Sequence, residues 1–221
     1  MASVPLEDMS VPQAGTLLVA AIRDHGSAGH RYAGSAELTE GPAAGRNLAD
    51  ALHFLCALHG RYPGVIELVA ARNVEPEARV WLAEASDAFA RERTYLANLS
   101  VRAGPVPATP GAGSESAVSM QRNAVLTLAQ SERRGCALGA AMGVAGDWAA
   151  IRTILDAAAA KFGADIPPPW TAGKPEALAA VADALGEGFA FRRAMLFGAE
   201  QVAVQHRGMW ELLHARAQAR G

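Results

Sequence analysis

Cysteine and aromatic residues are scarce in this 221-residue chain, which contains two cysteines and 6% aromatic residues. Cys56 and Cys136 lie in probable helices, and no Cys-x-x-Cys or Cys/His finger spacing occurs, so neither a disulfide scaffold nor a structural zinc site is supported. The chain also lacks the run of about 18 apolar residues that a membrane span needs. Its N-terminus has no basic region typical of a signal peptide. We therefore expect a soluble, cytoplasmic protein without a membrane partner.

An excess of charge of one sign is also missing, because 20 basic and 22 acidic residues leave a formal net charge of −2. This balance argues against nucleic acid as a partner. The common catalytic motifs GxGxxG, GxxxxGK[ST], GxSxG and HExxH do not occur in a suitable context. The sequence alone therefore does not identify a reaction.

Small and aliphatic side chains dominate the 51% of the sequence that is hydrophobic. This composition favours closely packed helices over a strand-rich sandwich. The spacing of the apolar residues predicts an all-α single domain, a bundle of five to seven helices formed by residues 43–221. Residues 1–42 are rich in Gly, Ser and Pro and are expected to form a flexible N-terminal arm with one short helix.

A long helical hairpin is predicted at the centre of this bundle. Its two helices span residues 76–101 and 115–142, and a proline-rich loop joins them. A further helix is expected to begin at Asp147, which would act as its N-cap. The last helix, residues 189–218, should close the core against the hairpin.

Two glutamates, Glu92 and Glu132, lie on the apolar side of their predicted helices. At 100° per residue, Glu92 falls roughly 20° from Trp81, within an apolar stripe. Glu132 falls among the apolar residues of its own helix, which are Val118, Val125, Leu128 and Cys136. A buried carboxylate must be paired, hydrogen-bonded, metal-bound or protonated, because burying it alone costs several kcal/mol. The pattern therefore predicts a polar centre inside the bundle.

One hypothesis is that this centre binds a small molecule or a protein partner, in a protein that is possibly a homodimer. The candidate ligand-binding residues are Glu92, Glu132, Gln121, Arg192 and Tyr95. A purely structural alternative is that the two glutamates form ion pairs with inward-facing arginines such as Arg122 or Arg192. No spacing in the sequence decides between these alternatives.

The other functional hypothesis is a ferritin-like metalloenzyme, an oxidase or oxygenase that uses Fe or Mn. Carboxylates that face each other across helices are typical of such sites. The candidate metal ligands are Glu92, Glu132, His53 and His206. One departure weighs against this hypothesis. Ferritin-like sites use Glu-x-x-His on two helices, whereas this chain has a single match, at Glu211 and His214.

Three glycines, Gly135, Gly139 and Gly143, recur every four residues in the second half of the chain. Each costs about 1 kcal/mol relative to alanine inside a helix, so a compensating contact is expected. We predict that another helix approaches closely at these positions. A ligand that lies against the bare backbone is the alternative.

Four segments of the sequence are distinctive: LHFLCALHGRYPGVIE (52–67), FARERTYL (89–96), GPVPATPG (104–111) and SERRGCALGAA (131–141). They resemble an uncharacterised all-helical family of alphaproteobacterial proteins, mostly from sphingomonads, that has no assigned function. The resemblance spans about residues 45–170. It implies an all-helical fold and transfers no catalytic residues.

Overall fold

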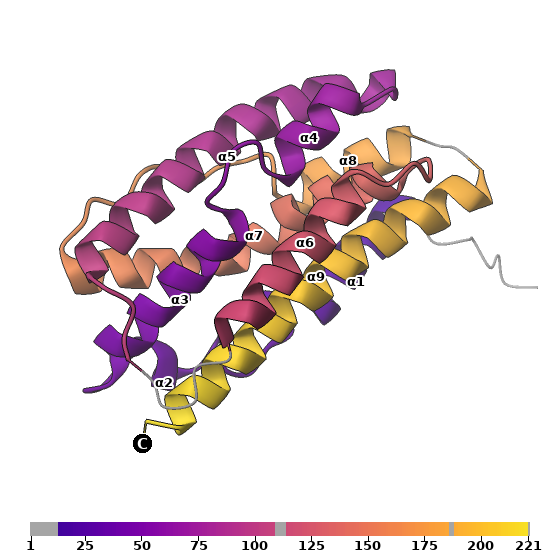
Figure 1. Ribbon diagram of the computed structural model, residues 1–221. Helices are drawn as coiled ribbons and strands as arrows, with labels where there is room; N and C mark the ends of the chain where they lie inside the picture. Colours follow the sequence, from indigo (N-terminus) through magenta and orange to yellow (C-terminus); the bar gives the residue numbers. More distant parts are fainter. Residues whose placement is uncertain (1–12, 109–113, 186–187, 221) are drawn as a thin grey trace, which may run out of the picture.

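The computed structural model describes residues 13–108, 114–185 and 188–220, and every regular element in these ranges is helical (Figure 1). The α-helices are α1 Ala14–His25, α2 Ala36–Thr39, α3 Ala44–His59, α4 Val65–Arg72, α5 Pro76–Ala103, α6 Ser114–Ala129, α7 Cys136–Phe162, α8 Pro175–Ala184 and α9 Phe189–Gln218, and a 3-10 turn, η1, spans Ser27–Gly29. The all-α prediction is confirmed. None of these helices is long and apolar enough to cross a membrane.

The pair α7 and α9 makes the most extensive helix–helix contact of the fold. Its close spacing depends on glycines. A Cβ on Gly139 would lie 1.9 Å from the Met195 carbonyl oxygen, and one on Gly143 would lie 2.8 Å from that of Ala199. On the facing helix, a Cβ on Gly198 would lie 2.0 Å from the Cys136 carbonyl oxygen. The predicted close approach of a second helix is confirmed, and it accounts for the glycine repeat.

The helices α5 and α6 follow each other in sequence and share α3, α4 and α7 as neighbours, but of the two only α5 contacts α8 and only α6 contacts α9 in the parts of the chain that the structure describes. In the described residues the two helices do not contact each other. Figure 1 shows α5 along one edge of the bundle and α6 across its middle. The centre of the fold is therefore the α7–α9 pair and not the predicted α5–α6 hairpin.

The predicted helix 115–142 is interrupted. Helix α6 ends at Ala129, and α7 begins at Cys136 after Gly135, whose φ of 92° is left-handed. This conformation favours glycine and allows the chain to turn before α7. Helix α7 then continues through Asp147, so the prediction of Asp147 as an N-cap is wrong. Gly146 does not end a helix; a Cβ there would lie 2.8 Å from Leu178 Cδ1, which shows that the glycine serves packing.

The N-terminal region contributes to the core. Helix α1 packs on α8 and α9. Leu18, Ile22, Tyr32 and Leu38 are buried. Residues 13–42 are therefore integrated into the bundle, where the sequence predicted an arm laid over it. The remainder of the predicted arm, residues 1–12, lies outside the described residues.

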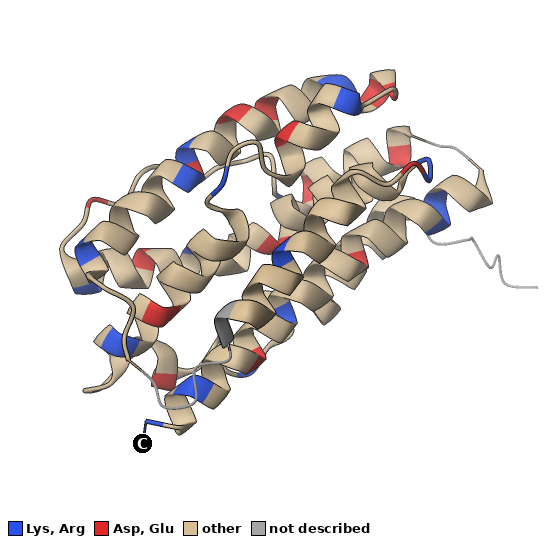
Figure 2. Cartoon of the chain, viewed as in Figure 1, with Lys and Arg blue, Asp and Glu red and all other residues tan. Residues whose placement is uncertain are grey.

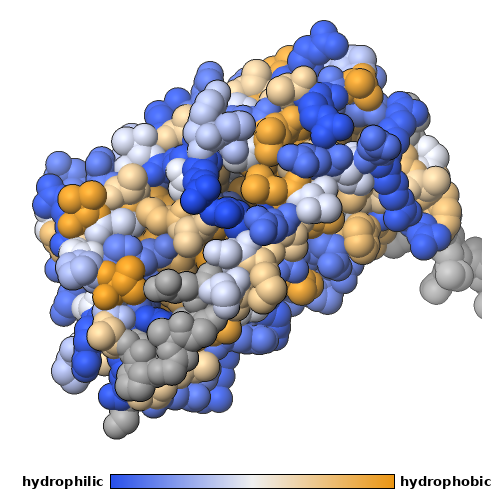
Figure 3. Space-filling view, in the orientation of Figure 1, coloured by the Kyte–Doolittle hydropathy of each residue, from blue (hydrophilic) through white to orange (hydrophobic). Residues whose placement is uncertain are grey.

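The surface carries both signs of charge on most helices (Figure 2). On the face shown in Figure 3, hydrophilic and hydrophobic residues are intermingled. The last turns of α9 are held by a buried carboxylate on α3: Arg216 donates to Asp50 from Nε and Nη2, at 3.2 and 3.1 Å, and Arg220 binds the same group. This contact joins the end of the described chain to the core.

Candidate functional site

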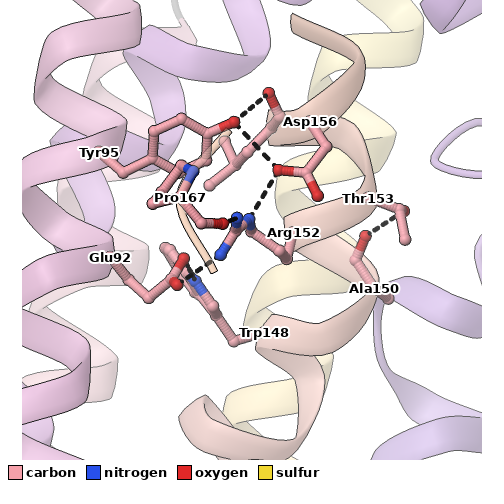
Figure 4. Close-up of polar contacts among 9 residues, drawn as sticks. Glu92, Tyr95, Trp148, Ala150, Arg152, Thr153, Asp156 and Pro167 are labelled. Carbon is pink, nitrogen blue, oxygen red and sulfur yellow. Dashed lines mark hydrogen bonds and ion pairs between the residues drawn. The ribbon is translucent and has the colours of Figure 1, made fainter. Parts of the chain in front are cut away.

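Glu92 is buried in an ion pair. Its Oε1 accepts a hydrogen bond of 2.7 Å from Arg152 Nη1, and its Oε2 accepts one of 3.0 Å from the indole Nε1 of Trp148 (Figure 4). The structural alternative considered from the sequence, an inward-facing arginine, is thus what the fold contains. The arginine is Arg152 of α7, however, and neither Arg122 nor Arg192.

The same network extends from Arg152 to the loop before α8 (Figure 4). Arg152 Nε donates to Asp156 at 2.7 Å, and its Nη2 donates to the Pro167 carbonyl oxygen. The Tyr95 hydroxyl donates to Asp156 at 3.0 Å, and burial raises the pKa of Tyr95. Partners within the protein therefore account for the buried charge of Glu92, and the network ties α5 to α7.

Glu132 lies in the exposed loop between α6 and α7, so the prediction that it faces the core is wrong. Because the helix ends at Ala129, the helical periodicity used for the prediction does not reach residue 132. Gln121 and Arg192 are half-buried on α6 and α9. Each retains a buried polar atom without a hydrogen-bond partner, Oε1 of Gln121 and Nε of Arg192. Among the five predicted ligand-binding residues, only Glu92 and Tyr95 share a network.

The four residues predicted to bind metal are also dispersed. His53 Nε2 lies 2.8 Å from the Gly104 carbonyl oxygen, and His206 bonds to Asp147. Glu92 is paired with Arg152, and Glu132 is exposed. In the parts of the chain that the structure describes, no group of three His, Cys, Asp or Glu side chains is arranged to hold a metal ion.

A second polar network crosses the core and was not predicted. Asp147 Oδ2 lies 2.6 Å from Nδ1 of His206, and Nε2 of His206 lies 2.7 Å from Nε2 of His59. All three side chains are buried, and His206 has no exposed surface (0%). We call Asp147, His206 and His59 the histidine chain. It connects α7, α9 and the last residue of α3.

The Asp147 end of the histidine chain is fully hydrogen-bonded. Ser27 of η1 donates to Asp147 twice, from its backbone N–H at 2.8 Å and from its hydroxyl at 2.6 Å. The hydroxyl in turn accepts from the Trp210 indole at 2.8 Å. A carboxylate is an acceptor only, so we assign the shared proton to His206 Nδ1. This assignment fixes the tautomer of His206, as a carboxylate beside a histidine commonly does.

His59 occupies the other end and is neutral at neutral pH. With Nδ1 protonated, His206 has only a lone pair on Nε2, so His59 must donate from its own Nε2. Its Nδ1 then carries a lone pair, for which the described residues provide no hydrogen bond. Burial lowers the pKa of His59 well below its usual range, and His206 and Arg93 lower it further. The Trp148 and Phe89 rings lie edge-on to the imidazole, with centroids 5.6 and 6.1 Å away, and hold it in place.

A small cavity adjoins His59. Its volume is about 20 Å³, it is partly open to solvent, and its walls come from α3, α4, α5 and α6 and the loop after α3. About 10–15 Å³ is sufficient for one water, so the cavity admits one water-sized group. Most of the lining is apolar and includes Leu58, Val65 and Val125; Arg61 and Arg122 add two guanidinium groups.

The loop that follows His59 is fixed by Arg93 of α5. Arg93 Nε donates to the His59 carbonyl oxygen at 3.2 Å, and its Nη2 donates to Glu67 at 2.7 Å. Glu67 also accepts from the Gly64 backbone N–H at 2.9 Å. One arginine therefore links the end of α3 to the start of α4 and holds the backbone at His59.

Sequence reasoning missed Asp147 and His59 as site residues, although a signal for His59 existed. His59 shares an apolar side of its predicted helix with Leu48, Leu52 and Leu55, as an inward-facing residue must. Asp147 was taken as a helix start because it follows a glycine. The same wheel argument that selected Glu92 would have selected His59. The distance between these residues in sequence hides their contact.

Comparison with known proteins gives one family match for this all-helical chain. No curated protein and no solved structure matches it. The family match covers residues 22–221, a longer span than the resemblance noted from the four sequence segments, and it includes all three residues of the histidine chain. The chain belongs to a family of unknown function (DUF6975).

Proposed function

We propose that this protein binds a small molecule of which one polar group enters the cavity beside His59 while the remainder lies outside it, and that the histidine chain supplies the polar, proton-accepting part of the site. The observation that carries this proposal is that the chain ends at a cavity. His59 lines the cavity, and its Nε2 is occupied by His206, so Nδ1 is the ring nitrogen available to a bound group. An apolar pocket with a few convergent polar groups is the usual form of a small-molecule site.

The contrast with Glu92 supports a functional role for the histidine chain. Glu92 is matched by the permanent charge of Arg152 and stabilises a particular packing of α5 on α7. Within the described parts of the chain Asp147 has no lysine or arginine partner; its partners are Ser27 and a histidine that can exchange its proton. Burying three titratable groups in one chain is costly and is common at functional sites. The arrangement allows a proton taken up at His59 to be stabilised by the carboxylate.

Fragment screening by NMR tests the proposal. Ligands that occupy the cavity should shift the resonances of His59, Phe89 and the Val125 methyl groups. The variant Val125→Phe, which fills the cavity, should remove these shifts. Val80 is exposed on α5 away from the cavity lining, so Val80→Phe is the matched control and should leave them unchanged. Binding that persists in the Val125→Phe protein, or a screen without any ligand at His59, would refute the proposal.

A further inference from the structure

We propose that the ligand at the His59 cavity is an oxyanion, of the carboxylate, sulfate or phosphate class, which places one oxygen in the cavity, and that the protein takes up one proton when it binds. This inference rests on the proposed function and names the class of its ligand. Two independent features support it: the charge around the cavity and the number of protons in the histidine chain.

Positive charge predominates at the cavity. Arg61, from the loop after α3, and Arg122, from α6, both line it. Arg93 contacts the His59 carbonyl oxygen, and Glu67, which binds the backbone of Gly64 in the loop, is already paired with Arg93 at 2.7 Å. The local charge therefore favours an anionic ligand.

Arg122 also has an unused donor. Its Nε is buried and has no hydrogen-bond partner among the described residues. A buried donor without an acceptor is unfavourable, and it marks a place where an acceptor is expected to bind. The oxygen of a bound anion in the cavity would accept from this group. A neutral hydrocarbon in the same space would leave the donor unsatisfied.

The proton count follows from the tautomers. In the neutral histidine chain, Asp147 is a carboxylate, His206 carries its proton on Nδ1, and His59 carries its proton on Nε2. The lone pair on His59 Nδ1 would repel an oxyanion. One proton added at His59 Nδ1 turns this atom into a donor, and the resulting imidazolium can pass its Nε2 proton to His206. The positive charge then lies beside Asp147, which stabilises it.

The charged and titratable groups around His59 come from every element that packs against it. They are His206 of α9 with Asp147 of α7 behind it, Arg93 of α5, Glu67 of α4, Arg122 of α6 and Arg61 of the loop. In the free protein this environment disfavours the imidazolium, consistent with the lowered pKa of His59. A bound anion places negative charge beside the ring and favours the imidazolium, so anion binding and protonation of His59 are coupled.

The experiment is a titration of the full chain with sodium sulfate near pH 6.5 in weakly buffered solution, at ionic strength held constant with sodium chloride. Sulfate does not titrate in this range, so any proton uptake belongs to the protein. A pH-stat should add close to one equivalent of acid for each sulfate bound. Acetate, titrated in parallel, separates a preference for planar carboxylates from one for tetrahedral anions. The wild-type measurement does not depend on the folding of any variant.

Three variants give the matched comparison. Arg122→Gln should weaken binding of the preferred anion at least about tenfold, the expected effect of losing a hydrogen bond from a charged group. His59→Gln should abolish the proton uptake. Arg133→Gln removes the same charge from the exposed loop before α7 and should change neither quantity.

The outcomes are distinguishable. Uptake of one proton that depends on His59 supports the inference. Anion binding without proton uptake overturns it, as does binding that is insensitive to both Arg122→Gln and His59→Gln. If neither anion binds while neutral fragments still occupy the His59 cavity, the anion inference fails and the proposed function stands. If nothing binds at the cavity, both fail.

Discussion

Replacing Glu92 by leucine should destabilise the protein strongly. The change removes the acceptor of two buried donors, the Arg152 guanidinium at 2.7 Å and the Trp148 indole at 3.0 Å. Removing one partner of a buried ion pair typically costs about 3–5 kcal/mol. Arg152 retains Asp156 and the Pro167 carbonyl oxygen, so we expect a loss at the lower end, about 3 kcal/mol. For a chain of this length the loss corresponds to a fall in Tm of about 6–12 °C.

The assay is thermal and urea denaturation of a double-mutant cycle. It compares Glu92→Leu, Arg152→Leu and the double variant with the wild type. The double variant should lose less than the sum of the two single variants, with a coupling free energy of at least about 1 kcal/mol. Asp156→Asn, at a partner whose side chain is 34% exposed, serves as the control and should cost less. A Glu92→Leu protein that melts within about 1 °C of the wild type would refute the structural role of the pair.

Three further predictions concern the core. Gly139→Ala should destabilise the protein by about 1–3 kcal/mol in urea denaturation, because the new methyl group would lie 1.9 Å from a carbonyl oxygen of α9. The control is Gly34→Ala, whose methyl group meets no atom within 4 Å and should change the free energy of unfolding little. In the unfolded state His59 gains a proton near pH 6.5, whereas burial keeps it neutral at that pH in the folded state. The free energy of unfolding should therefore fall as the pH drops below about 6.5, by up to about 1.4 kcal/mol per pH unit. The His59→Gln protein should have a shallower slope, and equal slopes would contradict the assignment. Asp50→Asn should speed amide hydrogen exchange in the last turns of α9, since it weakens the contact with Arg216; unchanged exchange there would contradict this role.

The helical periodicity of the sequence predicts much of the fold because most helices bury one continuous apolar side. Helix α9 spans the predicted range, Phe189–Gln218, and α5 begins at the predicted Pro76. The break between α6 and α7 was not predicted. The residues around Glu132 are compatible with a helix, and the turn depends on how α7 docks on α9.

The candidate site was only partly predictable for the same reason. The wheel argument placed Glu92 on a buried face, and Glu92 is buried; His206, which was a candidate metal ligand, is buried as well. Their partners come from helices far away in sequence: Arg152 is 60 residues from Glu92, and His59 is 147 residues from His206. Periodicity identifies inward-facing residues one helix at a time, whereas pairing depends on the tertiary arrangement. The error at Glu132 arose because a helical phase was extended past the end of its helix.

The most direct test of the histidine chain is its protonation pattern, read from long-range ¹H–¹⁵N correlation spectra of the imidazole rings at pH 7. The structure predicts a proton on Nδ1 of His206 that exchanges slowly with solvent, and a proton on Nε2 of His59 with Nδ1 unprotonated. Asp147→Asn should alter the protonation pattern of His206. Asp24→Asn, at an exposed position of α1, is the control and should leave that pattern unchanged. Two histidines that titrate independently near pH 6.5, with rapidly exchanging protons in both rings, would contradict the account.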